Sequence, residues 1–149
     1  MAMCKRQVRD SVAVDVISPT RRALVRDRRF EPDAYWKVVG GSIEKGDDSP
    51  IAAVIREVRE ETGDPSVPDS GIQLLPEEIT LVFERPFPNG SVQYFFVARV
   101  SEEKLDTHGK VGDEDGAPLD IQVVRRVDTL SMPDLLEWHK EIVRLDEKK

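Results

Sequence analysis

Residues 40–63, from Gly40 to Gly63, read GGSIEKGDDSPIAAVIREVREETG. Ser49 and Pro50 predict the start of a helix in this stretch, because a serine hydroxyl caps a first-turn N–H and proline suits the first helical position. Gly63 predicts its end, in the left-handed conformation that glycine adopts without steric cost. The segment therefore predicts a glycine-rich loop that leads into a capped helix over residues 50–62.

The faces of this helix differ in character. Its apolar residues recur at i, i+3, i+4 and i+7, the spacing of one buried face: Ile51, Val54, Ile55 and Val58. Beside that face, Glu57, Glu60 and Glu61 fall within one narrow sector, and Arg56 stands one turn before Glu60. Three like charges this close need a positive partner, and a divalent cation such as Mg²⁺ binds oxygen ligands. On the helix alone, an ordinary solvated face is the alternative.

The loop before the helix favours a ligand site. Gly40 and Gly41 allow the backbone to approach a ligand closely, and Gly46 permits a second bend. Together, loop and helix resemble the Nudix box, the signature of the Nudix hydrolases: Gly, five residues, Glu, seven residues, then Arg-Glu-aliphatic-any-Glu-Glu-any-Gly-aliphatic. The residues that match are Gly41, Arg56, Glu57, Val58, Glu60, Glu61 and Gly63.

The match departs from the family pattern at the first acid. Counting forward from Gly41 places that acid at Asp47, whereas counting back from Arg56 places it at Asp48. The chain therefore has one extra residue between loop and helix and an aspartate in place of glutamate. Asp64 also stands where an aliphatic residue is usual. None of these departures touches the three helix glutamates.

The resemblance implies a fold and a set of site residues. The fold is of the α/β class, an α/β/α sandwich with a central mixed β-sheet. Metal ligands would be Glu57, Glu60 and Glu61 with the carbonyl of Gly40, and the catalytic set would be Glu57, Glu60 and Arg56, in which Glu57 ligates or acts as base and Arg56 orients carboxylates. The residues that would support the loop are Gly41, Asp47 and Asp48.

The resemblance also implies an activity. This is metal-dependent hydrolysis of the diphosphate linkage in a nucleoside diphosphate linked to another moiety, with Mg²⁺ as cofactor and Mn²⁺ as its alternative. The partner is then a small nucleotide-derived diphosphate substrate, and many relatives are homodimers. A non-catalytic nucleotide-binding or regulatory module on the same fold is the alternative function.

Four residues outside the box are candidate substrate contacts. Arg26 suits a phosphate clamp, and Trp36 suits stacking on a base. Glu84 and Glu114 are acids on a predicted hairpin and in an acidic loop, respectively. Each has a plainer alternative, since most arginines of residues 21–29 would face water, an aromatic beside a strand is commonly core, and acidic loops are usually solvated.

Composition limits the remaining possibilities. The 149 residues suit a single domain over 1–149, and the net charge of −7 argues against binding to bulk nucleic acid or to an anionic membrane surface. A lone Cys4 excludes an intrachain disulfide. Because no long apolar run appears, we expect a cytoplasmic protein.

Other elements follow from alternation and turn residues. Strands are predicted over residues 8–16, 22–28, 35–39 and 121–127, and a hairpin over 79–85 and 91–100 joined at Asn89-Gly90. Residues 101–120 predict a loop. The stretch from Leu130 to Leu135 resembles a capping box that opens a C-terminal helix.

Overall fold

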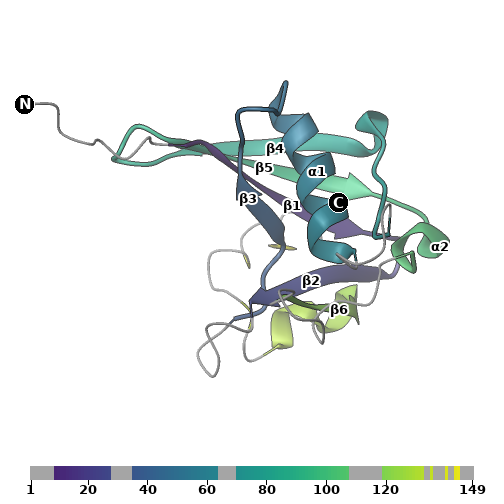
Figure 1. The fold of residues 1–149 in the computed structure, drawn as a ribbon. Helices are drawn as coiled ribbons and strands as arrows, with labels where there is room; N and C mark the ends of the chain where they lie inside the picture. Colours follow the sequence, from purple (N-terminus) through teal and green to yellow (C-terminus); the bar gives the residue numbers. More distant parts are fainter. Residues whose placement is uncertain are drawn as a thin grey trace, which may run out of the picture.

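Six strands form one mixed sheet in the computed structural model, which describes residues 9–27, 35–63, 70–107 and 119–132 together with residues 135, 140, 143 and 144. The strand order is β4-β5-β1-β2-β6, with β3 also paired to β1 (Figure 1). The strands are β1 (Ser11–Ile17), β2 (Arg21–Asp27), β3 (Val39–Ser42), β4 (Ile79–Pro86), β5 (Val92–Arg99) and β6 (Leu119–Arg125).

The central strand β1 is buried on both faces and divides its pairing along one edge. It runs parallel to β5 along its whole length, while Ser11–Val14 pairs antiparallel with β3. Val16 and Ile17 pair antiparallel with β2 instead. On this edge of β1 the pairing therefore changes from β3 to β2 at Asp15, the residue between the two paired stretches. Continuous burial explains why β1 reads as a nearly unbroken apolar run.

The helix α1 (Pro50–Thr62) begins as predicted, because the Ser49 hydroxyl accepts a hydrogen bond from the Ala52 N–H at 3.1 Å. It ends at Gly63, although the left-handed conformation predicted there is wrong: Gly63 is extended, with φ −101° and ψ 167°. Glycine is needed for space instead, since a Cβ at Gly63 would lie 2.7 Å from the carbonyl oxygens of Arg59 and Ser70.

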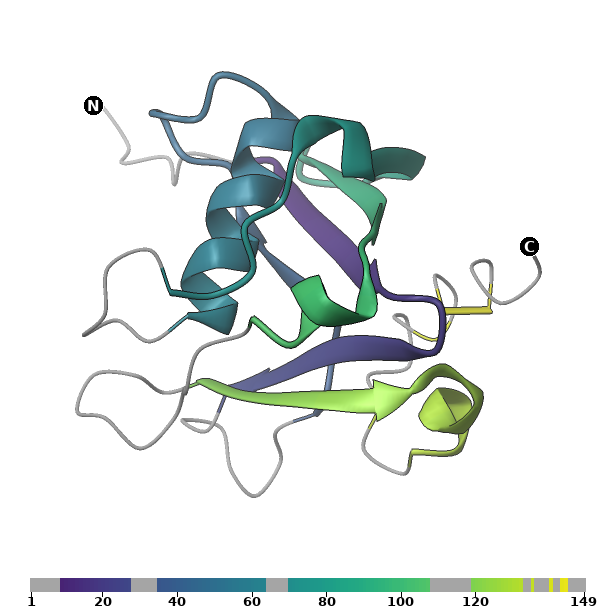
Figure 2. The same ribbon diagram turned by 90° about the vertical axis from the view of Figure 1, so that its right-hand side faces the viewer.

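Two apolar clusters lie on opposite faces of the sheet. The face beneath α1 buries the predicted helix residues Val54 and Val58 fully, and Ile51 and Ile55 pack against the same cluster. The other face carries a smaller cluster: Ala13, Leu24, Val38, Phe95 and Leu135. Figure 1 shows α1 crossing the sheet in front of β1, and in the turned view of Figure 2 the helix lies to one side of that strand. The predicted α/β fold with a mixed sheet is confirmed.

Several element boundaries differ from the sequence predictions. Gly40 and Gly41 belong to strand β3 rather than to a loop, because both pair with β1. Within the predicted loop 101–120, Ser101 caps a short helix, α2 (Glu102–Leu105), through the Lys104 N–H. Strand β6 begins at Leu119 and ends at Arg125, two residues earlier at each end than predicted. Two 3-10 helices, η2 (Pro76–Glu78) and η3 (Arg126–Ser131), complete the described elements.

The predicted helix start at Leu130–Leu135 is wrong. The Ser131 hydroxyl donates to the Asp128 carbonyl oxygen within η3, and Leu135 forms a parallel bridge with Trp36. Helical backbone occurs later, at Lys140, Val143 and Arg144. Cys4, Asp64 and Glu114 lie outside the described residues. Within the described ranges, no helix has the length and apolarity needed to cross a membrane.

Candidate functional site

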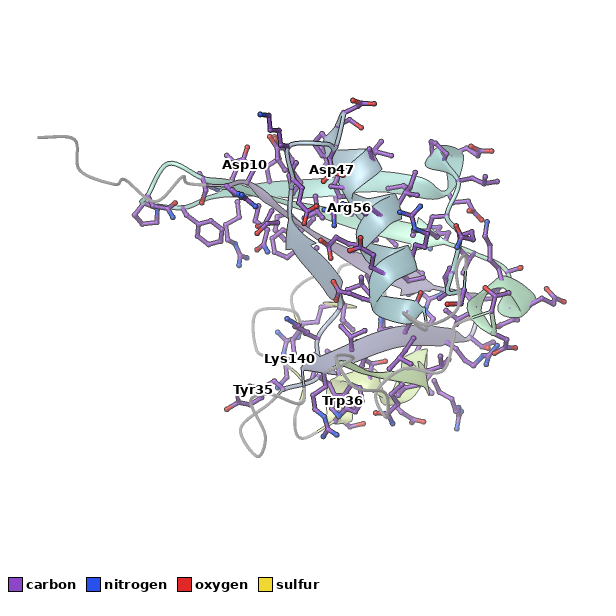
Figure 3. The ribbon with its side chains drawn as sticks, viewed as in Figure 1. Asp10, Tyr35, Trp36, Asp47, Arg56 and Lys140 are labelled. Carbon is purple, nitrogen blue, oxygen red and sulfur yellow. The ribbon has the colours of Figure 1, made fainter. Side chains whose placement is uncertain are left out.

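Arg56 joins the loop after β3 to the acidic side of α1. Its Nε and Nη2 donate to the two carboxylate oxygens of Asp47, each at 2.9 Å. Its Nη1 donates to Glu57 at 2.8 Å and to Glu60 at 3.1 Å, and Nη2 also reaches the Ser42 carbonyl oxygen at 3.0 Å. Figure 3 shows Asp47 and Arg56 side by side along α1. One guanidinium therefore organises both halves of the sequence motif.

The structure distinguishes the two aspartates that the sequence left open. Asp47 contacts Arg56, and its carboxylate also accepts the Glu44 backbone N–H at 2.8 Å. The hydrogen bond from Arg56 is the main reason that the pKa of Asp47 lies below its ordinary value. Asp48 is exposed to solvent. The carboxylate in contact with the box arginine is thus the one counted forward from Gly41.

Glu57 and Glu61 form a buried carboxyl pair. Both residues are buried, with 9% of Glu57 and 8% of Glu61 exposed, and Glu61 is hydrogen-bonded to Glu57. Burial, followed by that hydrogen bond, raises the pKa of Glu61 well above its ordinary value, while the charge of Lys37 and the backbone of Gly40 act against this rise. Because the pKa of Glu61 is raised, full ionisation of the pair is unfavourable unless a cation lies near it.

The two glycines of β3 create the room for this pair. A Cβ on Gly41 would lie 2.6 Å from the Glu57 carboxyl group, and one on Gly40 would lie 2.5 Å from the Val12 carbonyl oxygen. Any side chain at Gly41 would displace the Glu57 carboxylate. The double glycine thus allows close approach of β3 to Glu57 and to β1, whereas the predicted approach to a ligand stays a prediction.

The donor set fits a divalent cation in its chemistry. Two adjacent buried carboxyl groups repel each other when both are ionised, and a bound cation would balance that charge. Glu60 lies on the same side of the helix but is turned toward Arg56, with 54% of its side chain exposed. Among the described side chains, accordingly, no three His, Cys, Asp or Glu groups are arranged to hold a metal ion. The ligand assignments to Gly40, Glu57, Glu60 and Glu61 stay predictions.

The predicted substrate contacts are distributed over different places. Arg26 and Trp36 come together, because the guanidinium carbon lies 4.7 Å from the centre of the Trp36 ring. In Figure 3, Trp36 lies at the opposite end of the molecule from Asp47. Glu84 is exposed on β4, opposite Tyr94. The expectation that most nearby arginines face water is wrong for Arg22, which is fully buried against Asp15.

Sequence reasoning missed an aromatic row on the sheet face opposite α1. Phe83, Phe95, Ala13 and Gly40 stand opposite one another across four strands. The two phenylalanine rings stack with centres 4.4 Å apart. The row thus runs from the hairpin to the box glycine that contacts Glu61.

A polar row lies beside the aromatic one: Arg85, Gln93, Ser11 and Ser42. The Arg85 guanidinium lies over both phenylalanine rings, 5.7 Å from the centre of Phe83 and 5.3 Å from that of Phe95. The buried Gln93 Oε1 has no hydrogen-bond partner within the described part of the chain. Alternation predicts which residues share a face, but only the register between strands reveals these rows.

Comparison with known protein families agrees with the site. The model of the NUDIX domain matches residues 8–145, which includes the box and nearly all of the sheet. The chain belongs to the Nudix hydrolase family. The resemblance carried by residues 40–63 is therefore confirmed, and the match extends far beyond that stretch.

A curated relative is similar over a shorter stretch. Dihydroneopterin triphosphate diphosphatase from Escherichia coli (strain K12) is 40% identical over 63 residues, which is 42% of this chain and 35% of that protein. The match therefore spans about a third of the relative's length.

Solved structures share the fold. An ADP compounds hydrolase superposes with a TM-score of 0.65 at 20% identity, covering 94% of this chain and 71% of that one. The NUDIX domain of NrtR from Shewanella oneidensis, solved with ADP ribose, gives 0.63 at 19% identity, covering 96% and 89%. NrtR has also been solved with a 27mer DNA. At these identities, the likeness concerns the fold alone.

Proposed function

We propose that this Nudix protein hydrolyses the diphosphate linkage of a nucleoside diphosphate joined to another moiety, and that it depends on Mg²⁺ or Mn²⁺. The observation that carries the proposal is the buried Glu57–Glu61 pair beside Gly40 and Gly41, with Arg56 holding Glu57. Ion pairs on a merely solvated helix face would not bury two carboxyl groups against the two glycines of β3.

The residues of this chain have separate tasks in the proposed reaction. Glu57, Glu60 and Glu61, with the Gly40 carbonyl, would hold the cation, which when bound neutralises charge on the phosphoryl oxygens. Arg56 keeps the Glu57 carboxylate in one orientation at 2.8 Å. A glutamate beside the scissile linkage accepts the proton of the attacking water, and Glu57 is well placed for this because Arg56 and Gly41 restrict its position.

The rest of the substrate has a candidate platform on the sheet. The Phe83–Phe95 row leads to Gly40, and because Phe95 is fully buried, a planar group would reach Phe83 and the Arg85 guanidinium that lies over both rings. Arg85 supplies a cation for stacking or for a phosphate, and Gln93 supplies an acceptor for an amino group or a ring N–H. Adenine and pterin both carry such donors, which supports ADP-ribose and pterin triphosphates as first members of a substrate panel.

Turnover with and without metal tests the proposal. Purified protein is given ADP-ribose, dinucleoside polyphosphates, nucleotide sugars, nucleoside triphosphates and dihydroneopterin triphosphate, with Mg²⁺, Mn²⁺ or excess chelator, and products are identified by mass. We expect hydrolysis of at least one compound with metal only. Glu60→Gln and Glu61→Gln should each lower kcat by about 100-fold, because general-base and metal contributions are of that order.

A matched variant separates these losses from a general effect of charge. Glu77→Gln removes an exposed carboxylate in η2 and should retain wild-type turnover. Full activity of both Glu60→Gln and Glu61→Gln, or full activity in chelator, overturns the proposed mechanism. Tight binding of ADP-ribose without turnover of any compound would favour the regulatory alternative instead.

A further inference from the structure

Lys37 lies just before strand β3 and has no task in the reaction proposed above. Its backbone N–H donates to the Val25 carbonyl oxygen at 2.9 Å, and its carbonyl oxygen accepts the Val25 N–H at 2.8 Å. Val25 and Val39 both belong to the apolar cluster beneath α1, whereas Val38 belongs to the cluster on the other face of the sheet. Because side chains of an extended segment alternate between faces, Lys37 stands on the α1 face with Val39.

This face of the segment leads along the buried carboxyl pair. Gly41, on the same face as Lys37, approaches Glu57, since a Cβ there would lie 2.6 Å from the Glu57 carboxyl group. The backbone of Gly40 is hydrogen-bonded to Glu61, and the charge of Lys37 acts on the same carboxyl group, where it opposes the rise in pKa. Figure 1 shows β3 running beside α1. The pair is thus bordered by Gly41 at Glu57 and by Lys37 on the side of Glu61.

Lys37 differs from Arg56, which also borders the pair, in its contacts. The Arg56 guanidinium donates to three carboxylates, those of Asp47, Glu57 and Glu60. Within the described part of the chain, by contrast, the Lys37 ammonium group makes no hydrogen bond and no ion pair. Lys37 is also only partly buried. Its charge is therefore near the carboxyl pair but available to an anionic ligand, whereas that of Arg56 is engaged by the protein.

We propose that Lys37 is a further substrate-binding residue, whose ammonium group contacts an oxygen of the substrate diphosphate beside the Glu57–Glu61 pair. This inference rests on the proposed function, because a diphosphate that is hydrolysed there has to lie next to the two carboxyl groups. Its oxygens are negatively charged, and carboxyl groups do not attract them. An ammonium group is a compact point charge with three donors and is a common ligand of phosphate. Lys37 thus binds the diphosphate, whereas Arg56 orients the carboxylates.

Steady-state kinetics of Lys37→Met provide the first test, with the compound of the substrate panel that is hydrolysed fastest. The pairing with Val25 uses only backbone atoms, so the fold should be retained, which thermal unfolding checks. We expect KM to rise about tenfold and kcat to change less than about threefold, because the contact exists in the bound substrate and in the transition state alike. Lys37→Arg keeps the charge and should recover most of the loss. Lys45→Met, which removes an exposed lysine from the loop after β3, should stay within about twofold of wild type.

Calorimetric titration of inorganic diphosphate, with Mg²⁺ present and at several salt concentrations, provides a second test that needs no turnover. Lys37→Met should bind diphosphate at least about fivefold more weakly than wild type, and its affinity should depend less on salt, because one charged contact is lost. A purely structural role of Lys37 would leave the salt dependence unchanged.

Three results would overturn the role of Lys37. They are the absence of binding to wild type at millimolar diphosphate, equal affinity and salt dependence of Lys37→Met and wild type, and a fall in kcat with unchanged KM and diphosphate affinity. The last result would make Lys37 a residue that positions Glu61. If no compound of the panel is hydrolysed, the proposed function fails, but the titration with diphosphate still decides whether Lys37 binds the anion.

Discussion

Asp47 fastens the loop after β3 to the middle of α1 through the guanidinium of Arg56. It is nearly buried, accepts two hydrogen bonds from Arg56, and receives the Glu44 N–H. Arg56 in turn holds Glu57. A change at Asp47 therefore reaches a predicted catalytic carboxylate through one intermediate side chain, which makes Asp47 a positioning residue.

Asp47→Asn should lower kcat/KM by about tenfold, because a neutral amide gives up one of the two charge-assisted bonds to Arg56, and loss of an outer partner commonly costs this much. Asp48→Asn, at an exposed neighbour, should remain near wild type and cost less than Glu61→Gln. Turnover and thermal unfolding of the three variants make the comparison. A larger loss at Asp48 than at Asp47 would show that the loop is braced by the other aspartate.

Single residues differ in how well the sequence predicted them. The helix glutamates and Ser49 were predictable because helical rotation and capping are local rules. Gly63 was placed correctly at the helix end but for the wrong reason, since glycine is needed there for space beside the carbonyl oxygens of Arg59 and of Ser70, a residue outside the helix. Arg22 was misjudged because its partner Asp15 lies on the neighbouring strand. Contacts between distant parts of the chain leave no short-range pattern.

The short helix α2 stabilises the first turn of the sheet from a distance in sequence. Glu102 contacts three consecutive or near-consecutive positions of that turn: Ser18, Thr20 and Arg21. All of these bonds favour the ionised carboxylate, and this is why the pKa of Glu102 falls to about 2. The contribution of Glu102 to stability is therefore present above its unfolded pKa and declines as pH falls.

Glu102→Gln should lower the free energy of unfolding at pH 7, and its difference from wild type should shrink as pH falls from about 4.5 toward 2, where wild-type Glu102 also becomes neutral. Urea unfolding at a series of pH values measures this difference. Glu103→Gln is the matched control, because Glu103 is an exposed neighbour in the same helix. A difference between Glu102→Gln and wild type that stays constant down to pH 2 would contradict the explanation.

Elements with local signals were predicted best. Asn89-Gly90 correctly predicted the hairpin of β4 and β5, and Gly90 has the positive φ of 92° that such a turn requires. The register of the hairpin could not be predicted from these two residues, because a bulge between Leu81 and Phe83 shifts the pairing of the strands. The capping pattern at Ser131 failed since Leu135 pairs with Trp36, a partner nearly 100 positions away in the chain.

At the scale of the whole molecule, Arg22 connects three elements inside the core. Its Nε and Nη2 bind both oxygens of Asp15 at 2.7 and 2.9 Å, and its Nη1 donates to the Thr129 hydroxyl at 2.9 Å. Asp15 and Arg22 are both fully buried. The network ties β1 and β2 to η3 at the point where the edge of β1 changes partner.

Asp15→Asn should destabilise the fold by about 3–5 kcal/mol, because it leaves a buried guanidinium without its counter-charge. The double variant Asp15→Leu/Arg22→Met should recover a large part of that loss, since a buried ion pair replaced by apolar residues is often nearly neutral in stability. Urea unfolding of wild type, single and double variants gives both values. A double variant as unstable as Asp15→Asn would mean that the pair is needed for folding beyond its charge balance.

The change of strand partner at Asp15 also has a consequence for engineering. Every box residue predicted to act lies between Gly40 and Glu61, and within the described ranges β3, which begins that span, is paired in the sheet only with Ser11–Val14 of β1. Residues 39–63 thus join the sheet through one short antiparallel ladder, while α1 packs on the core through Val54 and Val58. We expect that transplanting the corresponding segment from another member of the family would alter the catalytic centre while the β2–β6 ladder, seated on the other half of β1, keeps its pairing.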